Sequence, residues 1–152
     1  MKIIIHLMQK LKMDRLKLND NKKLPWRFIE DINWNYLSKT FPNQPYDKVG
    51  EYCKQHYTLN EVILLHNFIV EKRQNLQDNL KGHIKGCGDD SFWDLCSHIV
   101  GLGESTYDLC LKHPEIAQVM ADNKEYVENF EYGFTKATYD LQEMNDNCSV
   151  SC

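Results

Sequence analysis

Residues 58–84 constrain the fold of this chain most strongly, because they combine a helix start signal with a long apolar stripe. Thr58 and Glu61 have the spacing of a capping box, in which each side chain accepts a hydrogen bond from the other residue's backbone amide. The apolar residues that follow have the spacing of one helix face. They are Val62, Leu65, Ile69, Leu76, Leu80 and Ile84, with Arg73 as a polar interruption. The pattern predicts a long helix that ends in the glycine-rich segment 82–88.

The rest of the chain shows the same helical periodicity, and no segment alternates apolar and polar residues as a half-buried strand does. Pro25 and Pro114 each precede an apolar stripe, as prolines at the first position of a helix do. Helix breakers are few, with only seven Gly and four Pro among 152 residues. We expect helices at residues 25–41, 45–57, 58–84, 91–110, 114–121 and 123–144. The sequence therefore predicts an all-α, single-domain bundle of about five to seven helices, with no sheet.

The expected helix at residues 91–110 has Ser91 as its N-cap and two glycines near its middle. At Gly101 and Gly103, the missing side chains either let another helix approach closely or mark a break in this one. The sequence allows both interpretations.

The two ends of the chain differ from its centre in composition. Residues 1–24 form a basic N-terminal segment, and its first 23 residues include seven Lys or Arg. Its apolar residues Ile4, Leu7, Met8 and Leu11 share one face, as in an amphipathic helix that packs on the body or contacts an acidic partner or a membrane surface. Residues 25–144 form the helical domain, and we expect residues 145–152 to be a flexible polar tail.

Charge and hydropathy exclude several classes of protein. The net charge of −4 leaves no broad basic surface to neutralise phosphates, so we expect no nucleic-acid partner. No stretch approaches the roughly 20 apolar residues of a membrane span, and the short apolar run before Lys10 is interrupted by His6. Six Cys without a framework spacing indicate free thiols and a cytoplasmic location. The Asn-, Lys- and Tyr-rich composition is typical of an AT-rich genome such as a phage's.

Four carboxylates in the C-terminal third form the pattern ExxE…ExxD: Glu125, Glu128, Glu143 and Asp146. This spacing resembles the motif of the all-α nucleoside-triphosphate pyrophosphohydrolases, and the resemblance implies a Mg²⁺-dependent enzyme with these four carboxylates as catalytic metal ligands. On a single helix the first and third of them lie about 27 Å apart, which is too far for a common metal cluster. The resemblance therefore requires a chain reversal near Gly133, and it stands as an alternative to a solvated charged face.

Two Cys/His pairs have a spacing that directs both side chains to one side of a helix: Cys53 with His56, and Cys110 with His113. Together they contain the four ligands of a tetrahedral Zn²⁺ site. Both cysteines also lie on apolar faces, where free Cys is usually buried. We therefore expect no cofactor, with a zinc-stapled helical domain as a second alternative.

Asp94 and His98 are four residues apart, so an expected helix brings their side chains together. Such a pair orients an imidazole in catalytic triads, but no nucleophile has a matching position. We interpret the pair as a surface ion pair or a helix cap.

Aromatic residues crowd the first half of the chain, and exposed aromatics are typical of protein interfaces. The candidate partner-binding residues are Trp26, Trp34, Tyr36 and Tyr46. We expect a small, non-enzymatic accessory or regulatory protein that acts through contact with a protein partner or through self-association.

Overall fold

The computed structural model describes residues 23–150, and these residues form helices joined by turns, without a strand. The predicted all-α fold without a sheet is confirmed. In chain order the helices are α2 (Lys23–Ile32), α3 (Trp34–Thr40), α4 (Pro45–His56), α5 (Leu59–Leu80), α6 (Asp89–Leu102), α7 (Glu104–Lys112), α8 (Pro114–Asp122) and α9 (Phe130–Val150). The expected amphipathic helix of the basic N-terminal segment lies outside the described residues. None of the helices from α2 to α9 has the length and hydropathy needed to cross a membrane.

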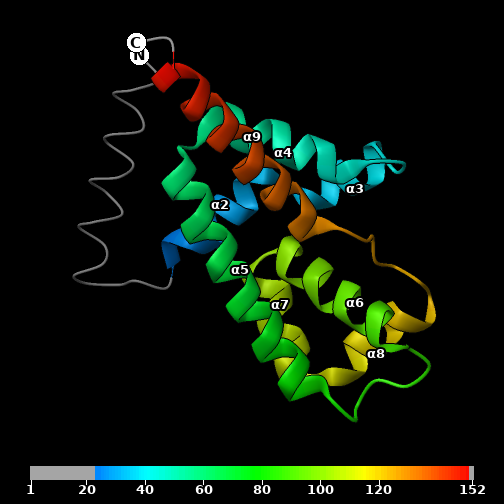
Figure 1. Ribbon diagram of the computed structural model, residues 1–152. Helices are drawn as coiled ribbons and strands as arrows, with labels where there is room; N and C mark the ends of the chain where they lie inside the picture. The colour runs from blue at the N-terminus through cyan, green and yellow to red at the C-terminus, as the bar shows by residue number, and fades with distance from the viewer. Residues whose placement is uncertain (1–22, 151–152) are drawn as a thin grey trace.

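The long helix α5 connects the two ends of the bundle (Figure 1). At one end α9 packs along α4 and also crosses α5, while at the other end α6, α7 and α8 pack against one another. The α5 helix contacts α2, α6, α7 and α9, so its buried face forms the centre of the core. Fully buried side chains from several helices meet there, among them Ile29, Ile69, Leu76, Ile99, Phe130 and Phe134.

The start of α5 has the predicted capping box. The Thr58 backbone amide donates to Glu61 Oε1 at 2.9 Å, and the Glu61 amide donates to Thr58 Oγ1 at 3.3 Å. The predicted stripe is buried from Val62 to Leu80, and Arg73 within it is buried too. The helix ends before Gly82, whose φ of 84° lies in the left-handed region that glycine adopts without strain.

Two segments that we expected to be single helices are each divided by a residue with positive φ. Asn33 (φ 58°) separates α2 from α3, and its side chain caps α3 by accepting a hydrogen bond from the Tyr36 amide. Gly103 (φ 111°) separates α6 from α7, so the break interpretation is correct there. Helix α6 begins at Asp89. Its N-cap is Gly88, not Ser91 as expected.

Gly101, by contrast, allows the Trp34 side chain of α3 to approach α6 closely. A Cβ atom at this position would lie 2.7 Å from Trp34 Cδ1, so the missing side chain makes room for the indole ring. The two glycines that the sequence could not tell apart therefore serve different purposes.

The last helix starts later and ends later than its sequence pattern predicts. It begins at Phe130, not at residue 123, because residues 123–129 form a loop in which Lys124 (φ 52°) and Asn129 (φ 72°) are left-handed. It continues to Val150, through most of the segment that we expected to be a flexible tail. Neither Gly nor Pro follows Gly133 in this helix, so no residue terminates it at the expected position.

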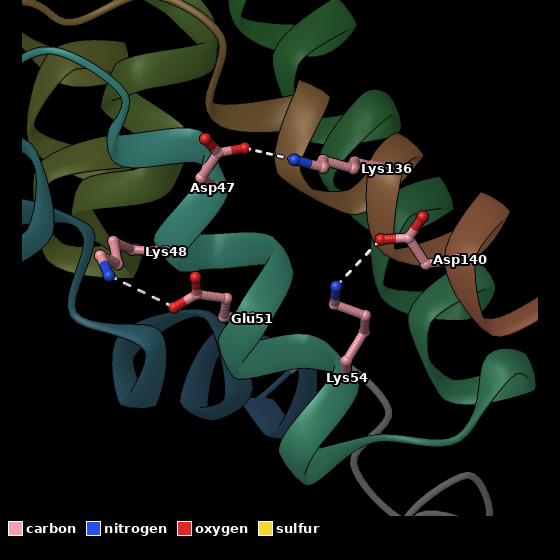
Figure 2. Close-up of polar contacts among 6 residues, drawn as sticks. All are labelled: Asp47, Lys48, Glu51, Lys54, Lys136 and Asp140. Atoms are coloured by element: carbon pink, nitrogen blue, oxygen red, sulfur yellow. Dashed lines mark hydrogen bonds and ion pairs between the residues drawn. The ribbon is translucent and has the colours of Figure 1, made fainter.

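Helices α4 and α9 pack closely together where Gly133 of α9 faces α4. Gly133 is enclosed so tightly that a Cβ atom there would lie 2.7 Å from Val49 Cβ. Two ion pairs flank the crossing: Lys136 with Asp47 at 2.6 Å, and Lys54 with Asp140 at 2.9 Å (Figure 2). The chain therefore does not reverse near Gly133, which lies inside a continuous helix.

Candidate functional site

A groove between α2 and α5 is lined mainly by apolar side chains. Its volume is about 250 Å³. Helix α2, the residue that ends α4 and the first half of α5 supply its apolar wall, which comprises Pro25, Phe28, Tyr57, Leu64, Leu65 and Phe68. The α5 residues from Glu61 to Glu71 extend along about 15 Å of helix, so the groove is two to three helical turns long.

Aromatic contacts hold the floor of the groove in place. Phe28 and Tyr57 meet edge to face at a centroid distance of 5.4 Å, and the Tyr57 hydroxyl donates to the Phe28 carbonyl oxygen at 3.4 Å. Burial raises the pKa of Tyr57, so this hydroxyl stays protonated and remains a donor. Trp26 packs edge to face on Phe68 at 5.3 Å and so fixes α2 against α5. The floor is therefore preformed.

Leu64 and two polar residues form the accessible edge of the groove. Leu64 is 46% exposed, and the neighbouring Ile63 is 38% exposed. Asn67 and Glu71 line the groove and are exposed as well. Glu61 also lines it, with its Oε1 atom committed to the capping box of α5. The edge thus combines apolar surface with negative charge.

The structure separates the four carboxylates of the ExxE…ExxD pattern into two groups. Glu125 and Glu128 lie in the loop before α9, whereas Glu143 and Asp146 lie in the second half of that helix. From Phe130 to Glu143 the helix rises by about 20 Å, so the two groups cannot share a metal cluster. Within residues 23–148, no three His, Cys, Asp or Glu side chains gather as a metal site would require.

The two Cys/His pairs are not arranged as one zinc site either. Cys53 and Cys110 are buried in the core, on helices α4 and α7. Their histidines are exposed: His56 packs against the Tyr52 ring and His113 contacts Glu115. Burial raises the pKa of the Cys53 thiol to about 12, which keeps the free thiol protonated.

Asp94 and His98 also face different surroundings, so the predicted pair does not form. His98 Nδ1 accepts hydrogen bonds from Trp34 Nε1 at 2.9 Å and from the Val127 amide at 3.1 Å. Burial, with a smaller effect of Lys39, lowers the pKa of His98 to about 4, and the imidazole is neutral. The pKa of Asp94 is raised by burial and by the nearby Glu128 and Asp90.

A buried ion pair joins α5 to α9. Arg73 binds Glu131 through Nε at 3.0 Å and through Nη2 at 3.3 Å, and its Nη1 donates to Gln77. The guanidinium also lies 4.4 Å from the centre of the Trp93 ring. Arg73 is the residue that interrupts the α5 stripe, and its partner is 58 positions away in the chain. No local pattern could identify this pair.

Of the four aromatic residues expected at a partner surface, two lie in the core. Trp34 is 0% exposed and Trp26 is 4% exposed, so both stabilise the fold instead of offering contact surface. Tyr36 is 55% exposed, and the half-buried Tyr46 packs against Tyr132 on α9 at 5.1 Å.

The groove between α2 and α5 has a sequence signal that is easily missed: Leu64, Phe68 and Glu71 form a second line at helical spacing beside the main apolar stripe of α5.

Comparison of the chain with family models, with curated proteins and with solved structures gives no match.

Proposed function

We propose that this protein is a small cytoplasmic accessory or regulatory factor that binds an amphipathic, basic helix of a protein partner in the groove between α2 and α5. The observation that carries the proposal is a preformed apolar groove whose edge combines the exposed Leu64 with the carboxylate of Glu71. Helix-in-groove recognition uses this combination: apolar anchors enter the groove, and flanking charges set orientation and specificity.

The size of the groove favours a polypeptide over a small molecule. Sites for drug-sized ligands and cofactors usually have about 300–1,000 Å³, whereas this cavity has about 250 Å³. A volume of that size accommodates one or two large apolar side chains, as an anchor residue of a helix supplies. The length of the groove along α5 accommodates two such anchors at positions i and i+3 or i+4 of a bound helix.

A designed peptide tests the proposal directly. A fluorescently labelled amphipathic helix of Leu and Lys, and a counterpart with Glu in place of Lys, are titrated against the full chain by fluorescence anisotropy. We expect the Lys peptide to bind at least about tenfold more tightly than the Glu peptide, because only the former complements Glu71.

Two variants at exposed apolar positions localise the binding. Leu64→Gln removes the apolar edge of the groove, while Val119→Gln makes the same type of change on α8, where Val119 is 54% exposed. We expect the first to weaken binding of the Lys peptide about tenfold and the second to leave it within twofold. Equal effects of both variants, or equal affinity for the two peptides, would contradict the proposal.

A further inference from the structure

We infer that the chain carries its own ligand for this groove: residues 1–22 occupy it intramolecularly and compete with the partner. Competition with a partner rests on the proposed function. Occupancy of the groove by residues 1–22 rests on the position of the groove and on the chemistry of the segment. Three observations support it.

The first observation is the position of the groove relative to the start of α2. The described chain begins at Lys23, and the groove wall already includes Pro25 and Phe28. The 22 preceding residues are therefore attached at the edge of the groove, and the eleven residues 12–22 link the last apolar residue of the segment's helix face, Leu11, to α2. A short tether of this type gives an effective concentration in the millimolar range, which favours the attached segment over a free ligand.

The second observation is the apolar pattern of the segment. Ile4, Leu7, Met8 and Leu11 have the spacing of one helix face, and this is the anchor pattern that a helix-binding groove accepts. Gln9 has a polar side chain and falls opposite that face at helical spacing. The same segment thus supplies both an anchor and a matched control position.

The third observation is charge. Within residues 1–22 the basic side chains are Lys2, Lys10, Lys12, Arg15, Lys17 and Lys22. Asp14 and Asp20 are the only acidic residues there, so the segment is basic. The exposed carboxylate of Glu71 at the groove makes that end of the cavity complementary to it. Apolar fit and opposite charge therefore point to the same occupant.

Photo-crosslinking in the full chain tests the occupancy. A benzophenone amino acid replaces Leu64 in one variant and Val119 in a control, and crosslinked peptides are identified by mass spectrometry after digestion. We expect position 64 to crosslink to peptides from residues 1–22 at several times the yield of position 119. Mixing ¹⁴N- and ¹⁵N-labelled chains distinguishes the chain's own segment from that of a second copy. Equal yields from both positions, or crosslinks mainly between differently labelled chains, would overturn the inference.

Two substitutions within the segment connect occupancy to function. We expect Leu7→Asp to reduce the crosslink from position 64 and to tighten binding of the Leu/Lys peptide about fivefold or more, whereas Gln9→Asp does neither. If the peptide binds all variants equally well, the competition is refuted and the proposed function survives. If the crosslink responds to Leu7→Asp but no variant binds the peptide, the occupancy survives and the proposed function fails.

Discussion

At the scale of single residues, buried polar side chains connect parts of the chain that are far apart in sequence. His98 accepts two hydrogen bonds at one nitrogen, from the Trp34 indole on α3 and from the Val127 amide in the loop before α9. A protonated imidazole has no lone pair at that nitrogen, so both bonds require the neutral form. The hydrogen bonds by which His98 joins α6 to α3 and to the loop before α9 therefore depend on pH.

The pH dependence of stability follows from this geometry. The pKa of His98 is about 4 in the folded protein, against 6.5 for an ordinary histidine. The unfolded chain therefore takes up a proton as the pH falls through 6.5 while the folded protein does not, and the free energy of unfolding decreases. We expect His98 to account for a loss of about 2 kcal/mol between pH 7.5 and pH 5, measured by urea unfolding.

His98→Asn is the matched variant, because its amide oxygen can accept a hydrogen bond near the Nδ1 position and does not titrate. It should lose less stability than the wild type over the same pH interval. His66, whose pKa is also lowered by burial, remains in both proteins, so the difference between them isolates His98. An identical loss in both proteins would show that His98 does not titrate as described.

At the scale of helices, the α4–α9 crossing shows how a single missing side chain sets an interhelical distance. Gly133 on α9 faces Val49 and the Tyr46 carbonyl oxygen on α4, and a Cβ atom would lie within 2.8 Å of both residues. The flanking ion pairs are partly exposed, so they orient the helices and contribute little stability (Figure 2). Close packing at the glycine is the main determinant of this crossing.

Gly133→Ala should therefore destabilise the protein although alanine favours helices. Relief of the clash requires backbone movement, and overpacking of this kind costs about 1–3 kcal/mol. Glu143→Ala is the control, because Glu143 lies on the same helix and its side chain is exposed. Chemical denaturation should show a clear loss for the first variant and a change of about 0.5 kcal/mol or less for the second. A Gly133→Ala protein as stable as the wild type would mean that the helices can separate freely.

At the scale of the whole molecule, contacts between residues distant in the chain join the two ends of the bundle. The Arg73–Glu131 ion pair joins α5 to α9, and the Trp34–His98 hydrogen bond joins α3 to α6. Each of the three tryptophans contacts a different set of elements: Trp26 packs on Phe68 and Tyr107, Trp34 on Phe130, and Trp93 on Arg73. Together they report on most of the core.

We expect the described bundle to unfold in one cooperative transition, because these contacts join α2, α3, α5, α6, α7 and α9. Tryptophan fluorescence and far-ultraviolet circular dichroism should give the same denaturant midpoint. Two distinct midpoints would show that the α4–α9 end and the α6–α8 end unfold independently.

Local signals in the sequence were sufficient for the fold class and for α4, α5 and α8. The capping box at Thr58, the apolar stripe of α5 and the helix-starting Pro114 act within one or two helical turns, and the structure has them where they were predicted. The apolar periodicity that predicted a helix from residue 123 was wrong about the start of α9. There the Val127 amide binds His98 across the bundle, and Phe130 begins the helix instead.

The sequence by itself determined which segments are helical and which of their faces are apolar, because hydrogen bonds between residues four apart and side-chain periodicity are local properties. Only the tertiary structure decided which polar residues become buried partners, which glycines serve as contact points and where a groove stays open. These features depend on atoms that are distant in the chain; in the bonds of His98 and Arg73 the partners lie 29 to 64 positions apart. Their energies arise from burial and close packing, which exist only after the helices have assembled.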